Sequence, residues 1–346
     1  MTTRPPRLRR AALFGAGRRG LSTHVVAIAA SPSLELDLVV DLDSELPRVR
    51  SEIGRLRTIY PGLTRSPSRL RISADGATDG TDWRDGLMPD IAFVATPHGS
   101  HVPLAYDIVR NRVPVVLEKP PAMSAAQLKM LIYESEQTGI PIATLMPARH
   151  LARFLPFRRA LESTRAGTEI ELCIDIPFYP GFGYWRTVRE QSGGGVLFDL
   201  GYHVLDLVVA RLGKPSTIDV CLTGAPTLIA SHGVDTGAEV WLYFEAAGTS
   251  VHAILGASSD LPPRFSIAVN GIQARIPTER NSRISPSVQA TLAQVHQLLN
   301  GGFIAEAGST AVPQSDLQHH LEVMELMDLL YFSARWIEAD VCAASQ

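Results

Sequence analysis

Short apolar runs alternate with segments of helical periodicity in the first part of the chain. The apolar runs cover residues 11–14, 36–40, 90–95, 113–117 and 140–145, and the helical segments cover 21–30, 102–112 and 124–138. Runs that are apolar at every position are typical of strands buried on both faces of a parallel sheet. This alternation predicts an α/β fold with a doubly wound parallel sheet. Residues 60–82, rich in Ser, Gly, Asp and Arg, are expected to form a surface connection with one edge strand.

The pattern changes near residue 146. Strand-like segments follow at 170–178, 218–222, 238–245, 249–257 and 265–276, with helical segments at 195–212, 287–299 and 316–337. Asn270-Gly271 is a two-residue turn that favours an antiparallel hairpin. We therefore predict a first domain over 1–145 and a second over 146–346, an α+β domain with an open, mostly antiparallel sheet. A sheet face without helices suggests pairing with another subunit, as a homodimer or homotetramer.

Composition and charge exclude several classes of protein. Of 346 residues, 45% are hydrophobic and 19% charged, which is typical of a folded globular chain rather than a disordered or fibrous one. A net charge of −3 gives no general attraction to nucleic acid or anionic lipid. The three cysteines form no CxxC pair, so we expect neither a disulfide framework nor a metal site. The absence of a signal-like or spanning apolar run predicts a cytoplasmic protein.

A glycine-rich motif lies between the first strand and the first helix. Its residues match G-x-G-x-x-G and are Gly15, Ala16, Gly17, Arg18, Arg19 and Gly20. Backbone N–H groups at such a turn hold a pyrophosphate, so the motif predicts a dinucleotide site in a Rossmann-type domain. Asp41 ends the second strand roughly 20 residues further on, where a carboxylate accepts hydrogen bonds from the adenosine ribose. That carboxylate repels a 2′-phosphate and favours NAD(H), whereas Arg18, Arg19 and Arg48 keep NADP(H) open.

Lysine is scarce in this chain. Of the 32 lysine and arginine residues, only Lys119, Lys129 and Lys214 are lysines. Lys119 follows a buried strand directly, at the sheet edge where open α/β folds bind ligands. An amine there can stabilise a developing alkoxide by a hydrogen bond, and unlike arginine it can release a proton. Lys119 is therefore a candidate catalytic residue.

Three polar residues share one face of the helix predicted over 195–212. Asp199, His203 and Asp206 lie four and three residues apart among apolar neighbours. Burying such a stripe is costly unless it is paired or faces a ligand. A histidine with a near-neutral pKa suits transfer of a hydroxyl proton during hydride transfer.

Four motifs occur along the chain in a fixed order. They are the glycine motif, then Thr96-Pro97-His98 with His101, then Glu118-Lys119-Pro120, then the segment from Gly193-Gly194-Gly195 through Asp199, Gly201 and His203 to Asp206. This order resembles the Gfo/Idh/MocA family of NAD(P)-dependent oxidoreductases (glucose–fructose oxidoreductase, inositol dehydrogenase and rhizopine-catabolism proteins). The resemblance covers nearly the whole chain. His98 departs from it, since the family pattern has Asn there.

The resemblance also implies roles for individual residues. It places Lys119 near the nicotinamide and substrate, makes His203 the general acid/base and makes Asp199 a substrate ligand, while Asp206 orients His203 or caps a neighbouring backbone. Cofactor contacts beyond the glycine motif and Asp41 are implied at Thr96, Pro97, His98, His101, Glu118 and Lys119, with packing or capping an equal alternative for His101. Substrate contacts are implied at Tyr184, Trp185 and Arg186, with core packing an equal explanation for Trp185, and at an arginine that follows the 140–145 strand. The family's arginine after the 140–145 strand is Arg149 or Arg153, and the spacing favours Arg149.

These observations together predict an NAD(P)-dependent oxidoreductase. It would interconvert a secondary alcohol and a ketone on a sugar, cyclitol or nucleotide-sugar, with Lys119 polarising the oxygen and His203 and Asp199 managing the proton. Two rivals use the same scaffold: reduction of a C=N or C=C bond, as in imine and biliverdin reductase relatives, and a non-catalytic dinucleotide-binding regulator. A Rossmann protein that binds a flavin or S-adenosylmethionine is a third, which the later motifs disfavour.

Overall fold

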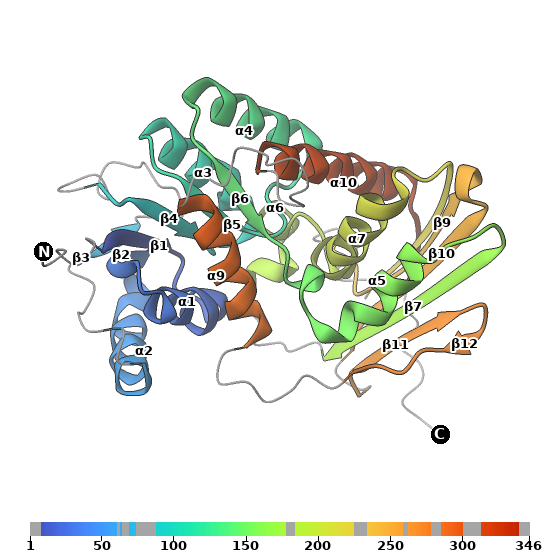
Figure 1. The fold of residues 1–346 in the computed structure, drawn as a ribbon, viewed down its shortest axis with the longest axis horizontal. Helices are drawn as coiled ribbons and strands as arrows, with labels where there is room; N and C mark the ends of the chain where they lie inside the picture. The colour runs from blue at the N-terminus through green and yellow to red at the C-terminus, as the bar shows by residue number, and fades with distance from the viewer. Residues whose placement is uncertain are drawn as a thin grey trace, which may run out of the picture. The chain divides into compact units, whose positions relative to one another are not determined.

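The chain folds into two compact units, each built on one sheet (Figure 1). The computed structural model describes residues 8–60, 63, 69–73, 88–177, 184–224, 234–258, 262–277, 285–299 and 313–338. The first unit comprises Met1–Pro121, Gln127–Pro147 and Ser282–Gln318. The second comprises Ala122–Ala126, Ala148–Asn281 and His319–Gln346. Among the described helices, none is long and apolar enough to cross a membrane.

The first unit contains a parallel sheet of six strands in the order β3-β2-β1-β4-β5-β6. The strands are β1 (Arg9–Phe14), β2 (Leu34–Leu42), β3 (Arg69–Ser73), β4 (Ile91–Val94), β5 (Val115–Glu118) and β6 (Ile142–Leu145). Its helices are α1 (Val26–Ala30), α2 (Leu46–Ile59), α3 (His101–Arg110), α4 (Ala125–Thr138, which begins in the second unit) and α9 (Pro286–Leu299). This confirms the doubly wound parallel sheet. The strand order reverses between β1 and β4, the point at which such sheets bind ligands.

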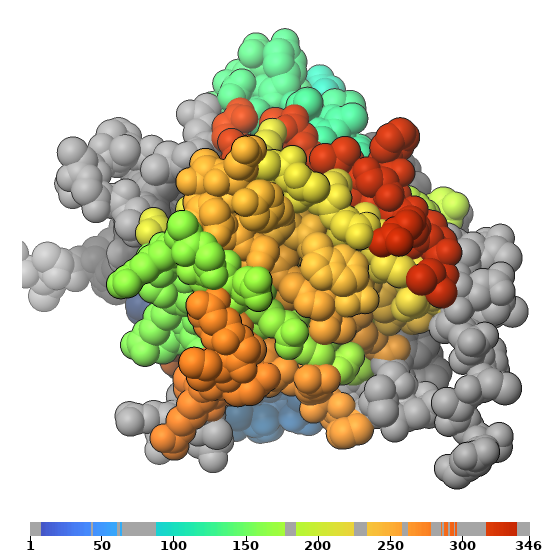
Figure 2. Space-filling view, turned by 90° about the vertical axis from the view of Figure 1, so that its right-hand side faces the viewer, coloured from blue at the N-terminus to red at the C-terminus, as the bar shows by residue number. Residues whose placement is uncertain are grey.

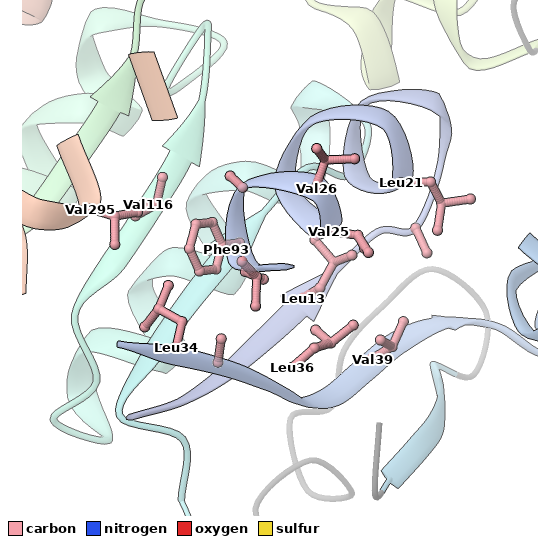
Figure 3. Close-up of a cluster of buried hydrophobic side chains, with 14 of the residues drawn as sticks. Leu13, Leu21, Val25, Val26, Leu34, Leu36, Val39, Phe93, Val116 and Val295 are labelled. Carbon is pink, nitrogen blue, oxygen red and sulfur yellow. The ribbon is translucent and has the colours of Figure 1, made fainter. Parts of the chain in front are cut away.

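The central strands of this sheet are buried because their side chains are apolar on both faces. Leu13 of β1 and Phe93 of β4 are fully buried, and they pack with Val25 and Val26 from the first helix (Figure 3). Of the 60–82 segment, most residues lie outside the described ranges, but β3 is the expected strand at the sheet edge.

Helix α9 belongs to the first unit, although the sequence pattern grouped it with residues 146–346. Val288 and Val295 lie two turns apart on α9 and are 1% and 2% exposed within the core of the first unit (Figure 3). Helical periodicity shows which stripe of a helix is buried, but not which part of the chain covers that stripe.

The second unit contains a mixed sheet of seven strands in the order β12-β11-β7-β10-β9-β8-β13. The strands are β7 (Thr168–Pro177), β8 (Thr217–Gly224), β9 (Gly237–Phe244), β10 (Thr249–Ser258), β11 (Arg264–Val269), β12 (Ile272–Gln273) and β13 (Arg335–Glu338). Its helices are α5 (Leu155–Glu162), α6 (Arg189–Ser192), α7 (Tyr202–Leu212) and the greater part of α10 (Pro313–Ser333). Four of its six strand pairings are antiparallel, as predicted, and two are parallel.

Two details of the second unit refine the sequence pattern. Asn270 and Gly271 both have positive φ, 49° and 75°, and they form the turn between β11 and β12 that their sequence predicts. The last helix ends at Ser333 rather than near 337, because Arg335–Glu338 forms β13 and pairs with β8. A strand made by a few terminal residues depends on a partner strand that is distant in sequence.

One face of the second sheet is covered by α5 and α7, and the opposite face is seen in Figure 2. Alternate residues of β9 are buried under the helices, while Trp241 and Tyr243 are 36% and 45% exposed. Trp241 stacks on His252 of β10 with ring centroids 4.7 Å apart, and Nε2 of His252 lies 2.9 Å from a carboxylate oxygen of Glu239. The open face therefore mixes aromatic and charged side chains, whereas the sequence reading expected an apolar face.

Candidate active site

The glycine motif forms the turn that follows β1. Gly15 has a φ of 84°, and a Cβ there would lie 2.7 Å from the carbonyl oxygen of Ala95. A Cβ on Gly20 would collide with the carbonyl oxygen of Gly15. At Gly17, in contrast, a Cβ would meet no atom within 4 Å. Gly15 thus lets the turn approach the residue after β4, Gly20 lets the start of the helix pack on Gly15, and Gly17 leaves open space along the backbone.

Asp41 lies beside this turn at the end of β2. One of its carboxylate oxygens accepts a 2.7 Å hydrogen bond from the backbone N–H of Ala16, and the other accepts one from Leu42. Arg48 of α2 donates a hydrogen bond to the carbonyl oxygen of Ala16 and pairs with Glu45 at 2.6 Å. A carboxylate oxygen can accept two hydrogen bonds, so each oxygen of Asp41 has room for one more, from a ribose hydroxyl. A carboxylate and a guanidinium therefore both approach the turn where an adenosine ribose would lie.

The open space at Gly17 and one buried side chain fit a dinucleotide at this sheet edge. Thr96 follows β4, and its Oγ1 is buried without a hydrogen-bond partner among the described residues. In a turn of this type, backbone N–H groups at the start of the following helix hold a phosphate. The residues present therefore suit NAD(H) or NADP(H).

His101 joins the turn after β4 to the loop after β5. It is fully buried, and its Nδ1 and Nε2 lie 2.8 Å from the carbonyl oxygen of Pro120 and 3.0 Å from that of Thr96. Burial lowers the pKa of His101, although both hydrogen bonds to carbonyl groups oppose that effect. These contacts hold the turn after β4 and the loop after β5 together. His98 is also buried, and its ring stands edge-on to His101 at 5.5 Å.

Glu118 ends β5 and forms a buried pair with a residue that the sequence reading missed. Its carboxylate lies 3.1 Å from Nε2 of His24, and the two side chains are 8% and 0% exposed. Burial alone raises the pKa of Glu118, but the hydrogen bond from His24 and the positive charges of Arg19, His24 and Lys119 outweigh it and lower the pKa to about 2. The next residue, Lys119, is 8% exposed and is joined to Pro120 by a cis peptide bond. The only sequence signal for His24 was a lone histidine inside an apolar helical segment.

Two helices near the candidate site residues begin with a π-helical turn. In the first unit, η1 (Gly20–Val25) contains His24 and continues into α1. In the second unit, η9 (Leu197–Gly201) contains Asp199 and continues into α7, which carries His203. The sequence pattern predicted ordinary α-helix at both places. Wider turns of this kind are frequent at functional sites.

Asp199 is part of a small polar cluster in the second unit. Nε of Arg186 lies 3.8 Å from its carboxylate, and the guanidinium of Arg186 stacks 4.3 Å above the ring of Trp185. Arg186 and Asp199 are 36% and 29% exposed, so both reach solvent. The η8 turn (Tyr184–Thr187) supplies the arginine and the tryptophan. The structure thus brings together three of the residues that the resemblance assigned to substrate binding.

His203 and Asp206 have separate surroundings although they share α7. His203 is partly buried, with its ring 6.4 Å from that of Phe154. Asp206 is fully buried and accepts hydrogen bonds of 2.9 and 2.6 Å from Arg149 and one of 2.9 Å from His319. Burial raises the pKa of Asp206, but the charge of Arg149 and these hydrogen bonds hold it well below its usual range. Arg149 is therefore engaged with a buried carboxylate.

The glycine triplet before η9 allows very close packing. Asp235 accepts hydrogen bonds from the backbone N–H groups of Gly195 and Leu197 and from the hydroxyl of Tyr331. A Cβ at Gly195 would collide with the carbonyl oxygen of Asp235. Asp235 and Tyr331 thus fix the start of the helix that carries Asp199 and His203. No local sequence pattern indicated either residue.

Two models of known protein families match the chain, one in each part of it. Residues 9–144 match the model of the oxidoreductase family with an NAD-binding Rossmann fold, and residues 154–276 match that of the GFO/IDH/MocA C-terminal domain. The chain belongs to the GFO/IDH/MocA family. This confirms the resemblance seen in the four motifs, and it makes the first unit an NAD-binding Rossmann domain.

The names of individual relatives of this GFO/IDH/MocA protein refer to different compounds. D-glucoside 3-dehydrogenase of Escherichia coli is 25% identical over 64% of this chain and 58% of its own length. The rhizopine catabolism protein MocA of Rhizobium meliloti is 27% identical over 60% of this chain and 58% of its own. The first curated relatives are matched over 38% to 54% of their own length. The WlbA dehydrogenase of Thermus thermophilus, solved with NAD and UDP-GlcNAcA, shares the fold with a TM-score of 0.65 at 20% identity, over 92% of this chain and 94% of its own.

Proposed function

We propose that the protein is an NAD(P)-dependent oxidoreductase that interconverts a secondary alcohol and a ketone on a sugar, cyclitol or nucleotide-sugar. The observation that carries this proposal is the edge of the first sheet. The glycine turn after β1, the turn after β4 and the loop after β5 meet there, and His101 bonds the last two to each other. A protonatable amine, Lys119, follows β5 in the same place. Open α/β sheets bind their ligands at this edge.

The chain's own residues have distinct roles in this proposal. The turn at residues 16–20 and Asp41 would hold the dinucleotide, which supplies or accepts a hydride. Lys119 hydrogen-bonds the substrate oxygen and stabilises the charge that develops on it. His203 takes up or returns the hydroxyl proton, and Asp199 binds a substrate hydroxyl. Arg186 places a positive charge 3.8 Å from the carboxylate of Asp199.

Cofactor binding is the first test. Nicotinamide fluorescence is followed while purified protein is titrated with NADH and, separately, with NADPH. Because the Asp41 carboxylate repels a 2′-phosphate, NADH should bind more tightly, and Asp41→Asn should reduce that preference. Glu52→Gln, on the exposed side of α2 and paired with Arg55, is the control that should leave the preference unchanged. Binding of neither nucleotide would contradict the proposal and favour a regulator or a different ligand.

Reaction class is the second test. With the preferred nucleotide, a panel of sugars and cyclitols is compared with imine and enone substrates. We expect turnover of a polyol or its ketone, and Lys119→Met should abolish most of it. Turnover confined to C=N or C=C compounds would overturn the proposed reaction while leaving the cofactor assignment intact.

We also propose that the open face of the second sheet pairs two copies of the chain. Trp241 and Tyr243 supply exposed aromatic area on this face, while Glu239 and His252 supply charge. Light scattering should give at least twice the mass of a single chain, and Tyr243→Lys should reduce it. A wild-type species of 37.5 kDa at micromolar concentration would remove this proposal.

A further inference from the structure

The two arginines that follow β6 differ in what holds them. The side chain of Arg149 is 29% exposed and makes two hydrogen bonds to the buried carboxylate of Asp206. Arg153 is exposed, and among the described residues its guanidinium makes no hydrogen bond or ion pair. The spacing argument favoured Arg149 as the substrate residue. The contacts favour Arg153 instead, because a guanidinium already bonded twice to a buried carboxylate has fewer donors for a ligand.

Two aromatic side chains lie near Arg153. Its guanidinium carbon lies 5.9 Å from the ring centre of Phe154 and 5.7 Å from that of Phe265. These two rings pack edge to face with centroids 5.0 Å apart, and Phe154 is 3% exposed. A guanidinium near aromatic rings is attracted by them and keeps its N–H groups free to donate. Arg153 is thus an exposed cation with two aromatic neighbours.

One ring of this pair, that of Phe154, also lies near the candidate acid/base His203. Phe154 has Arg153 on one side and His203 on another, with ring centroids of Phe154 and His203 6.4 Å apart. One phenylalanine ring therefore separates the cation from the histidine. Two further arginines of this unit lie over aromatic rings: Arg186, which already faces the carboxylate of Asp199, and Arg189, which lies over Tyr331.

We propose that Arg153 binds an oxyanion of the substrate, a phosphate or a carboxylate, and that the preferred substrates are anionic sugars. This rests on the proposed function. A planar guanidinium with two free N–H groups matches a phosphate or carboxylate in a two-point hydrogen bond. The reacting hydroxyl lies at His203, and the anionic group lies at Arg153, beyond Phe154.

The test compares three probes that share one sugar ring. Glucose 1-phosphate, glucuronate and glucose are titrated by calorimetry into the protein with saturating NADH, which cannot oxidise them, and kcat/KM for oxidation is measured separately with NAD+ for each probe that turns over. We expect at least one anionic probe to bind more tightly than glucose. Arg153→Gln should lower the anionic-to-neutral affinity ratio about 10- to 100-fold, the usual size of a charged hydrogen bond. The phosphate and carboxylate probes distinguish the two oxyanions.

Two further variants keep the result interpretable. Arg153→Lys retains the charge without the planar fork and should recover only part of the ratio. Arg159→Gln removes another exposed arginine from the neighbouring helix α5, and it should leave the ratio at its wild-type value.

The failures of this inference and of the proposed function look different. If glucose binds as tightly as both anionic probes, or if Arg153→Gln leaves the ratio within about twofold, the role of Arg153 is overturned and the oxidoreductase proposal stands. If NADH binds but no sugar binds or reacts, the proposed function and the role of Arg153 fall together.

Discussion

Glu118 in the first unit and Asp206 in the second are both buried carboxylates near a residue proposed to act in catalysis, yet their partners differ in kind. Glu118 pairs with one histidine, and the charges of Arg19 and Lys119 support it from nearby. Asp206 is bonded directly by the guanidinium of Arg149 and by His319. A buried ion pair with direct hydrogen bonds from arginine leaves a large penalty when one partner is removed. The two sites should therefore respond differently to mutation.

The largest effect is expected at Arg149. Arg149→Met leaves Asp206 buried without its main cation, so the free energy of unfolding should fall by about 3–5 kcal/mol. Urea denaturation measures the loss, and Arg159→Met, an exposed arginine of α5, should change it by no more than about 0.5 kcal/mol. A loss below about 1 kcal/mol at Arg149 would show that His319 suffices to hold the carboxylate of Asp206. The contrast with Glu118 would then disappear.

The next effect concerns turnover rather than stability. His203→Gln removes the proposed proton carrier, so kcat should fall about 10²- to 10³-fold. The dissociation constant for NADH should stay near its wild-type value, because the glycine turn and Asp41 lie in the other unit. Wild-type turnover of His203→Gln across a full pH profile would remove His203 from the mechanism.

A smaller loss is expected at His24. His24→Leu removes the hydrogen bond to a buried carboxylate and should cost about 1–3 kcal/mol of unfolding free energy. His24→Gln keeps an N–H donor at this position and should lose less. The cost is smaller than at Arg149 because the charges of Arg19 and Lys119 still lower the pKa of Glu118. Equal losses for the leucine and glutamine variants would show that the cavity, and not the hydrogen bond, sets the cost.

Acid should weaken the first unit through Glu118. Its pKa is about 2 in the folded chain against a usual 4.5, so its stabilising contribution is complete above pH 4.5 and is lost as pH falls toward 2. The slope is at most about 1.4 kcal/mol per pH unit for one proton. Unfolding free energies measured between pH 6 and 3 should show a shallower decline for Glu118→Gln than for the wild type. Parallel curves would mean that Glu118 is not the group that titrates.

Most elements of the first unit could be predicted from the sequence, although helix α2 was not. The inner strands β4, β5 and β6 carry short apolar runs because a parallel sheet is covered on both faces, and glycines mark some of the turns. The second unit was harder. β13 and the packing of α9 in the first unit both depend on partners far away in sequence. Local periodicity carries no information about such partners.

The candidate site shows the same division. Motifs identified the glycine turn, Asp41, Lys119, Asp199 and His203, because their chemistry is tied to a local backbone shape. His24, Asp235 and Tyr331 were missed, since each acts through a contact with a residue at least 36 positions away. Arg149 and Arg153 look alike in the sequence. Only their contacts distinguish an arginine bonded to a buried carboxylate from one that lies near aromatic rings.

The sequence by itself determined the family, the parallel sheet and the residue types at the sheet edge, because strand burial and turn geometry impose local patterns. Tertiary structure decided which buried charges pair, which arginine is open to a ligand and where the glycine triplet packs. Pairing depends on distance in space, and a hydrogen bond between residues 24 and 118 or 149 and 206 leaves no periodic trace along the chain.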